Sequence, residues 1–214
     1  MVLGMACWFA AAPTLGAYSS SFALDHLAHQ YTDPKAIASF LRHEFTFRRD
    51  EDLFGEVDRW QSPEEFLTRK AGDCEDYALL AKALLERNWV TAYVFSLFGD
   101  DSYAHTVCVF LDEHGRYNVI NQDQVRYYRA KSLEALASAL HPGWTFGGIV
   151  EQDGLRGRFV KRITNVHPAP ALGDDAFATG GFERDPSTTS FLLSLPCSFT
   201  KCSGILETFD RSLS

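Results

Sequence analysis

Apolar residues recur at helical spacing through the first half of the chain. The range Asp33–Phe45 opens with an Asp-Pro pair, the form of a helix N-cap followed by proline, and therefore predicts a helix. Ser62–Lys70 opens with Ser-Pro-Glu-Glu and predicts a shorter second helix. A third helix is expected over Cys74–Asn88, where one face is apolar. Thr46–Asp58, between the first two helices, is charged and is expected to be irregular.

The second half of the chain shows strand-like runs separated by turns. Val90–Phe98 is nearly all apolar or β-branched, which predicts a buried strand, and Tyr103–Leu111 and Arg116–Asn121 follow as two more strands. Four further elements are expected: a strand at Val125–Arg129, a helix at Ser132–Leu140, and candidate edge strands at Trp144–Val150 and Arg158–Ile163. Helices first and strands afterwards indicate an α+β fold, with N-terminal helices packed on an antiparallel sheet.

The two ends of the chain differ from this central domain, which we place at residues 24–165. Residues 1–17 are apolar and uncharged, and Ser21-Phe22-Ala23 has small residues where a signal peptidase cuts. This pattern predicts a signal peptide over residues 1–23 and export to the periplasm or the extracellular space. Because no Lys or Arg precedes the apolar stretch, a flexible leader on a cytoplasmic protein is the alternative. Residues 166–214 are expected to form a disordered or irregular tail.

Composition narrows the classes of function. The chain has 214 residues, 46% of them hydrophobic, and a formal net charge of −8. Such a charge argues against a nucleic-acid partner, which requires a basic face. No apolar run of about 18 residues occurs after the leader, so no integral membrane segment is expected in the mature chain. The 5 cysteines are too few for a disulfide scaffold. We expect Cys197 and Cys202 to form a local disulfide in an exported protein, or to remain thiols otherwise.

One cysteine, one histidine and one asparagine stand in an order that suggests nucleophilic chemistry. Cys74 begins the third helix, His105 lies in a strand, and Asn121 ends the next strand. A thiol attacks as the thiolate, and a helix N-terminus stabilises that anion by only about 0.3–1 kcal/mol, so a histidine base is needed as well. Cys108 lies on the opposite face of the strand from His105, and we expect it to be a small buried hydrophobe.

The turn between these two strands decides which residue faces His105. With a three-residue loop at Asp112–His114, His105 lies opposite Asn121. With the loop at Glu113–Gly115, and Gly115 in the left-handed conformation, His105 lies opposite Asp123. Both candidates are on one face of a regular strand, and either could orient the imidazole by accepting its N–H. A two-residue loop would put both on the wrong face, so the triad depends on the turn.

The acids around Cys74 oppose this chemistry, because negative charge raises the pKa of a thiol. Asp73 is expected to cap the helix, with Asp76 completing a capping box. Two interpretations of Asp73, Glu75 and Asp76 are open. Either they point away from the thiol as cap and surface charges, or they bind a hard cation such as Ca²⁺, which takes several oxygen ligands.

At these residues the chain resembles the transglutaminase-like cysteine hydrolases, and in particular the bacterial transglutaminase-like cysteine proteinases. Gly72–Ala78 (GDCEDYA) resembles their nucleophile motif, and Tyr103–Val107 (YAHTV) resembles the strand that carries the histidine. Gly115–Asn121 resembles the segment that ends in the third triad member. The likeness spans about Asp33–Asp123, and more loosely it extends to Asn165.

The resemblance implies a papain-like α+β fold with Cys74 as nucleophile and His105 as general base. It favours Asn121 over Asp123 as the third member, at a position where the family usually has Asp. A neutral Asn orients the ring but stabilises the imidazolium less than a carboxylate would.

The resemblance also implies a calcium site and suggests donors for an oxyanion. In the proteinase branch, acids flanking the cysteine bind calcium, which would correspond to Asp73 and Glu75. Trp60 and Gln61 are candidates for the oxyanion or the groove, alongside the backbone N–H of Cys74.

The predicted function is that of a thiol-nucleophile amide hydrolase, a cysteine peptidase that passes through a thioester acyl-enzyme. Its partner would be a peptide or protein substrate, and the chemistry requires no cofactor, although Ca²⁺ is implied by the resemblance. One alternative is a protein-glutamine acyltransferase or deamidase, and another is a catalytically inactive peptide- or protein-binding module of the same fold. A Cys/His metal site is disfavoured because Cys74 and His105 supply only two ligands.

Overall fold

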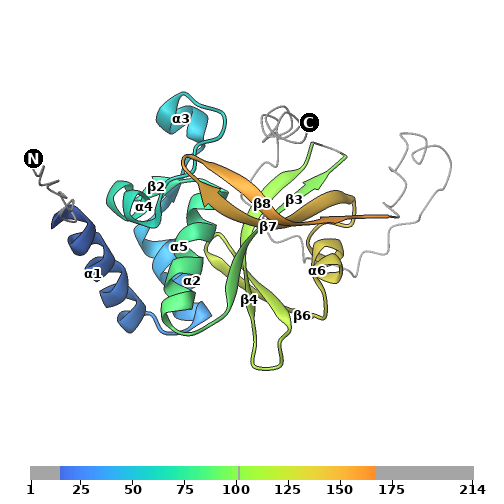
Figure 1. The fold of residues 1–214 in the computed structure, drawn as a ribbon, viewed down its shortest axis with the longest axis horizontal. Helices are drawn as coiled ribbons and strands as arrows, with labels where there is room; N and C mark the ends of the chain where they lie inside the picture. Colours follow the sequence, from blue (N-terminus) through green and yellow to red (C-terminus); the bar gives the residue numbers. More distant parts are fainter. Residues whose placement is uncertain (1–14, 101, 167–214) are drawn as a thin grey trace, which may run out of the picture.

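The computed structural model describes residues 15–100 and 102–166, and it confirms the predicted α+β architecture. Helices from the N-terminal half cover one face of a six-stranded antiparallel sheet built from the C-terminal half (Figure 1). Most of the expected signal peptide, and the tail from residue 167 with Cys197 and Cys202, lie outside the described residues. The predicted boundary after residue 23 falls within helix α1 (Leu15–Gln30).

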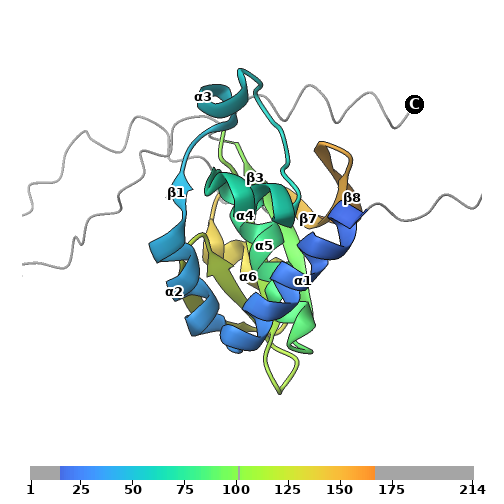
Figure 2. The same cartoon turned by 90° about the vertical axis from the view of Figure 1, so that its left-hand side faces the viewer.

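Three helices begin where their capping residues predict. Helix α2 (Pro34–Glu44) starts at Asp33, whose carboxylate accepts the backbone N–H groups of Lys35 and Ala36. Helix α4 (Pro63–Arg69) starts with a capping box, and helix α5 (Cys74–Arg87) follows. Figure 2 shows α5 at the centre of the helical layer, and it packs against α1, α2 and α4.

The segment that was expected to be irregular contains regular structure. Strand β1 (Thr46–Phe47) and helix α3 (Asp50–Phe54) lie within it. The prediction missed β1 because so short a strand has no visible period. It is held instead by parallel pairing with β2 (Ala71–Gly72), just before α5. This pairing ties the chain ahead of α3 to the segment that carries the cysteine motif.

The sheet has the strand order β6-β5-β4-β3-β7-β8, with every neighbouring pair antiparallel. Its elements are β3 (Ala92–Gly99), β4 (Ala104–Leu111), β5 (Tyr117–Asn121), β6 (Gln124–Ala130), β7 (Trp144–Asp153) and β8 (Arg156–Thr164), with helix α6 (Leu133–Leu140) between β6 and β7.

The expectation that Trp144–Val150 forms an edge strand is wrong, because β7 pairs with both β3 and β8. Two glycines let its neighbours approach closely. A Cβ at Gly147 would stand 2.7 Å from the carbonyl oxygen of Ser96 on β3, and a Cβ at Gly148 would overlap that of Lys161 on β8.

The two faces of the sheet bury separate cores. Cys108, Phe110 and Ile120 pack with the N-terminal helices, whereas Val107 and Val109 pack with α6 on the other face. The prediction that Cys108 is a buried hydrophobe is confirmed, and burial raises the pKa of its thiol. The strand alternation expected around His105 is therefore present.

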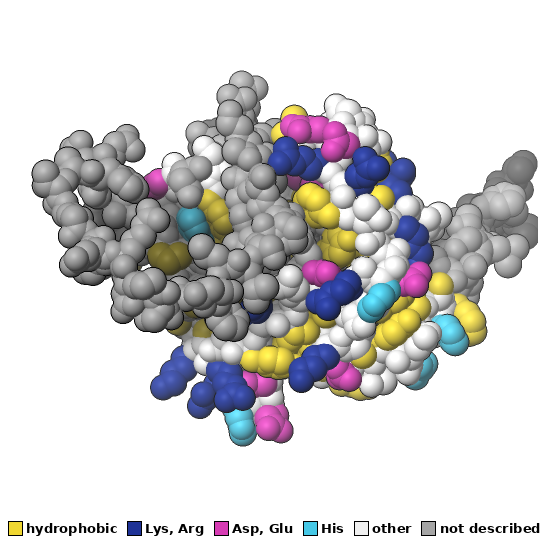
Figure 3. Space-filling model, turned by 180° about the vertical axis from the view of Figure 1, so that it is seen from behind, with side chains coloured by type: hydrophobic (Ala, Val, Ile, Leu, Met, Phe, Trp, Pro, Cys, Tyr) yellow, Lys and Arg dark blue, Asp and Glu magenta, His cyan; other side chains and the backbone are white. Residues whose placement is uncertain are grey.

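The outer surface is mixed in character. On the face seen in Figure 3, Lys and Arg side chains are interspersed with acidic and hydrophobic ones. Across the described part of the chain, no helix combines the length and the apolar character that crossing a bilayer requires.

Candidate active site

Cys74 is the first residue of α5, and its side chain is 7% exposed. The carboxylate of Asp76 accepts the backbone N–H of Asp73 at 3.3 Å, so the predicted capping residues do organise the helix start. The Cys74 thiol donates a hydrogen bond to Oε2 of Glu75 at 3.2 Å. The nucleophile candidate thus lies at a helix N-terminus with a carboxyl group beside its sulfur.

The β4–β5 hairpin has the second of the two predicted registers. Leu111 pairs with Tyr117, and Gly115 has the left-handed φ of 69° that a loop at Glu113–Gly115 requires. Continued regularly, this register would place residue 123 opposite His105.

The strand stops before that register reaches Asp123. Gln122 has a φ of 51°, which turns the chain, and Asn121 pairs with Gln124 to begin β6. The Asp123 carboxylate instead accepts from Nε of Arg42 at 3.1 Å. Nε2 of His105 lies 2.8 Å from Oδ1 of Asn121, so the imidazole is paired with the carboxamide and Asp123 belongs to a different contact.

This hydrogen bond fixes the protonation of the ring. An amide oxygen only accepts, so Nε2 of His105 carries the proton and Nδ1 keeps its lone pair. Burial lowers the pKa of His105, and the bond to Asn121 partly opposes that effect. The imidazole is therefore neutral at neutral pH, which is the form that can accept a proton from a thiol.

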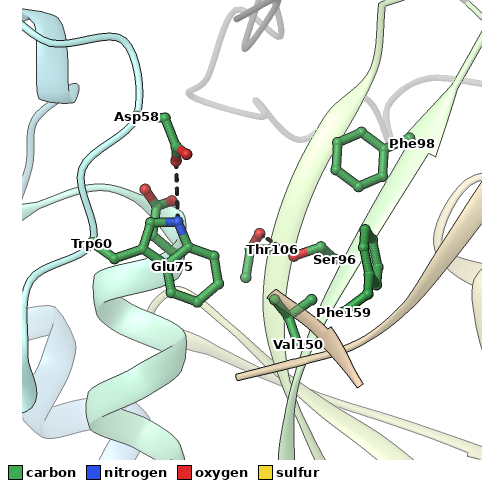
Figure 4. A pocket seen from close by; sticks show the side chains of 8 residues that line it. All are labelled: Asp58, Trp60, Glu75, Ser96, Phe98, Thr106, Val150 and Phe159. Atoms are coloured by element: carbon green, nitrogen blue, oxygen red, sulfur yellow. Dashed lines mark hydrogen bonds between the residues drawn. The ribbon is translucent and has the colours of Figure 1, made fainter. Parts of the chain in front are cut away.

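The start of β4 lies beside the start of α5. Glu75, next to Cys74, and Thr106, next to His105, line the same crevice between helix and sheet (Figure 4). Its lining consists of Asp58, Trp60, Glu75, Ser96, Phe98, Thr106, Val150 and Phe159. By strand alternation, His105 shares the face of Val107 and Val109, which pack with α6 rather than with α5.

The two oxyanion candidates have their side-chain donors engaged elsewhere. Trp60 is 4% exposed, lines the crevice, and donates its indole N–H to Asp58 at 3.0 Å. Nε2 of Gln61 donates to the carbonyl of Ala71 at 3.0 Å and to Oδ2 of Asp76 at 2.6 Å. An oxyanion role for either side chain would require these bonds to break, whereas a groove role for Trp60 agrees with its position.

Five buried carboxylates lie close together near Cys74: Asp50, Asp58, Asp73, Glu75 and Asp76. Ligand atoms of Asp50, Asp58 and Glu75 lie within 4.8 Å of one another, as do those of Asp50, Asp73 and Asp76. The expectation that the flanking acids are surface charges is therefore wrong. Neither periodicity nor spacing pointed to Asp50 and Asp58, which come from the segment around α3.

Crowding of these acids shifts their protonation. Burial, followed by repulsion from Asp73, raises the pKa of Asp50 to about 8. Burial raises the pKa of Asp76 to about 7, although N–H groups of Gln61 oppose the shift. The pKa of Glu75 is raised well above its usual range by burial and by Asp73. Burial and mutual repulsion thus disfavour the charged forms of these acids, and several of them take up protons near neutral pH.

The cluster fits a hard cation. Oδ1 of Asp50 and Oδ1 of Asp73 are buried and, within the described residues, accept no hydrogen bond. Buried carboxylate oxygens without donors are the ligands that Ca²⁺ takes. Asp73 and Glu75, the two residues that the resemblance implied, are both in the cluster, and the fold adds Asp50 and Asp58 to them.

Comparison with known structures gives partial backbone similarity. Calcium-bound LapG from Legionella pneumophila is 18% identical and has a TM-score of 0.44, with 66% of this chain and 82% of that chain covered. EGTA-treated LapG has 18% identity and a TM-score of 0.40, with coverage of 61% and 84%. A Cytophaga hutchinsonii protein proposed to be a cysteine protease has 14% identity and a TM-score of 0.39, with coverage of 69% and 54%.

A family model gives a firmer result than these structural similarities. No curated protein matches the chain. The model of the transglutaminase-like domain matches residues 22–136, which is more than half of the chain and includes the cysteine, histidine and asparagine described above. This protein belongs to the transglutaminase-like domain family.

Proposed function

We propose that the protein is a thiol-nucleophile amide hydrolase, a cysteine peptidase whose triad is Cys74, His105 and Asn121. The main support is the 2.8 Å contact between His105 and Asn121, which orients a neutral imidazole. Cys74 supports it as the first residue of α5, where a helix N-terminus favours a thiolate. Family membership agrees with this chemistry, and the burial of Cys108 against the N-terminal helices leaves Cys74 as the better nucleophile.

In the proposed reaction, Nδ1 of His105 takes the proton of the Cys74 thiol. The Cys74 thiolate then attacks the amide carbonyl carbon, and the carbonyl oxygen becomes an oxyanion near the backbone N–H of Cys74. The imidazolium gives its proton to the leaving nitrogen as the C–N bond breaks, which leaves a thioester. Water, deprotonated by the same imidazole, attacks the thioester, and the thiol is regained as the acid product departs.

Asn121 supports the proton transfer from the thiol, whereas the charged acids oppose it. The Asn121 oxygen accepts from Nε2–H, so that Nδ1 is the nitrogen with the lone pair that accepts the thiol proton, but the carboxamide adds no charge to stabilise the imidazolium. Charged Asp73 and Glu75 would raise the pKa of Cys74. When bound among Asp50, Asp58, Asp73 and Glu75, a calcium ion would supply the positive charge that offsets this effect.

Thiol labelling tests the assignment before any substrate is known. Iodoacetamide should label Cys74 far faster than Cys108, with a pH profile well below that of free cysteine, and His105→Gln should slow that labelling. Cys108→Ala is the matched control and should leave the rate unchanged. Equal, slow labelling of both thiols would refute the catalytic proposal and favour an inactive binding module.

Turnover then identifies the reaction. Purified protein and its Cys74→Ala variant should be incubated with peptide and amine substrates, in calcium and in chelator. Release of new peptide termini by the parent protein alone supports hydrolysis, whereas incorporation of the amine identifies acyl transfer. Cleavage that persists in Cys74→Ala would end the assignment.

A further inference from the structure

The hydrogen bond to Asn121 acts on one edge of the His105 ring. The torsion that rotates an imidazole about its Cβ–Cγ bond is broad and roughly two-fold, so a half-turn of the ring exchanges the two sides. Such a turn would move Nε2 away from Asn121 and redirect Nδ1. The proposed chemistry requires one orientation, and an aromatic contact with the face or edge of the ring favours it.

Tyr103 supplies a contact of that kind. Its ring centroid lies 6.2 Å from that of His105, with an interplanar angle of 67°, which is an edge-to-face arrangement. Tyr103 is two residues before His105, so the two side chains project from the same face of the chain. Its carbonyl accepts the backbone N–H of Gly99 at 2.8 Å, which fixes the backbone of Tyr103 at the β3–β4 turn.

Tyr103 is itself in contact with His141. Its ring stacks on Tyr103 with centroids 4.0 Å apart and an interplanar angle of 5°. His141 caps the C-terminus of α6, where its N–H donates to Ala137 at 2.9 Å and its carbonyl accepts from Trp144 at 3.1 Å. The C-terminal end of α6 thus stacks the His141 ring on Tyr103, and the Tyr103 ring contacts that of His105.

We infer that Tyr103 is a positioning residue for His105, and that His141 supports it by stacking. This inference rests on the proposed function, because it concerns the orientation of the same imidazole. Asn121 sets which nitrogen carries the proton, and the aromatic pair sets the plane in which the ring stands. Neither Tyr103 nor His141 exchanges a proton with the substrate in this scheme.

The test uses the full chain and compares Tyr103→Leu with Tyr103→Phe. Leucine keeps apolar volume but removes the ring, whereas phenylalanine keeps the ring and removes only the hydroxyl. Nitrogen NMR of ¹⁵N-histidine protein reports the tautomer of His105, which is assigned by loss of its signals in His105→Gln. Labelling of Cys74 by iodoacetamide at pH 7 reports the consequence for the thiol.

Wild type and Tyr103→Phe should show one His105 tautomer, protonated at Nε2, and labelling rates within about twofold of each other. Tyr103→Leu should show exchange between tautomers and roughly two- to tenfold slower labelling, the range expected for loss of an aromatic contact. His141→Leu should change both readouts in the same direction, and His141→Phe should restore them.

An unchanged tautomer and rate in Tyr103→Leu would overturn the inference. Should that variant not fold, the His141→Leu and His141→Phe pair decides by the same criteria. Failure of the proposed function would look different, because wild-type Cys74 would then label slowly and without dependence on His105, while the tautomer comparison would still report on Tyr103.

Discussion

A methyl group at position 72 would strike the carboxylate that organises the start of α5. The backbone of Gly72 is not in the left-handed region, so alanine is disfavoured there by space and not by conformation. An added Cβ would overlap Oδ2 of Asp76 and stand 2.8 Å from Nε2 of Gln61. Asp76 is fully buried, so its carboxylate has little room to move aside.

The magnitude follows from two costs. Overpacking a filled site costs about 1–3 kcal/mol. A displaced Asp76 carboxylate would also weaken the bonds it accepts from the backbone of Gln61 (2.8 Å), the side chain of Gln61 (2.6 Å) and the backbone of Asp73 (3.3 Å). Each is worth about 0.5–1.5 kcal/mol. Partial loss of these bonds gives a total of roughly 2–5 kcal/mol, equivalent to a fall in Tm of roughly 5–15 °C.

A double-mutant cycle checks the cause. Free energies of unfolding should be measured by urea denaturation for the parent, Gly72→Ala, Asp76→Ala and the double variant. Asp76→Ala removes the overlapping carboxylate but keeps the Cβ of residue 76, which would stand 2.9 Å from the new methyl group. Gly72→Ala should therefore cost measurably less in that background than in the parent, without becoming neutral. Equal costs in both backgrounds would show that the clash with Asp76 is not the reason that glycine is needed.

Three further predictions concern charge at the site. The folded-state pKa values of Asp50 (about 8) and Asp76 (about 7) exceed the usual 3.8, so the protein in chelator binds more protons when it is folded than when it is unfolded. Its free energy of unfolding should therefore fall as the pH rises from about 4 to 8. Urea denaturation at pH 5 and at pH 8 checks this, and a higher free energy of unfolding at pH 8 would contradict it. Calcium at 100 times its Kd should add about 2.7 kcal/mol at pH 8, measured by calorimetry, and less in Asp50→Asn. Asn121→Asp should raise the pKa of His105, whereas Asn121→Ala should remove the acceptor of its Nε2–H. Iodoacetamide should therefore label Cys74 faster at pH 6 in Asn121→Asp than in Asn121→Ala. Equal labelling rates in the two variants would argue against the His105–Asn121 pairing.

Local signals in the sequence predicted much of this fold. The N-caps at Asp33 and Ser62 are visible because capping needs a few specific residues at fixed positions. The loop that places Gly115 in the left-handed conformation was one of two that the sequence allowed, and the structure has it. Such features depend on neighbours in the sequence, and they therefore appear in a single chain.

Features that depend on distant contacts could not be predicted in this way. The left-handed turn at Gln122 ends β5 and separates Asn121 from Asp123, but glutamine carries no strong preference for that conformation. Asp50 and Asp58 become part of the acid cluster only because the α3 segment lies close to the acids at the start of α5. Their role depends on tertiary structure and has no local pattern.

The attachment of α1 bears on how the protein could mature. Leu24 and Ala28 are buried in the core, Asp25 accepts from Nε of Arg87 at 2.8 Å, and the carbonyl of Ala28 accepts from Asn88 at 3.0 Å. All of these anchors follow residue 23. If the chain is cut after Ala23, as the predicted signal peptide requires, these anchors stay with the remaining chain and continue to hold it to the C-terminal end of α5.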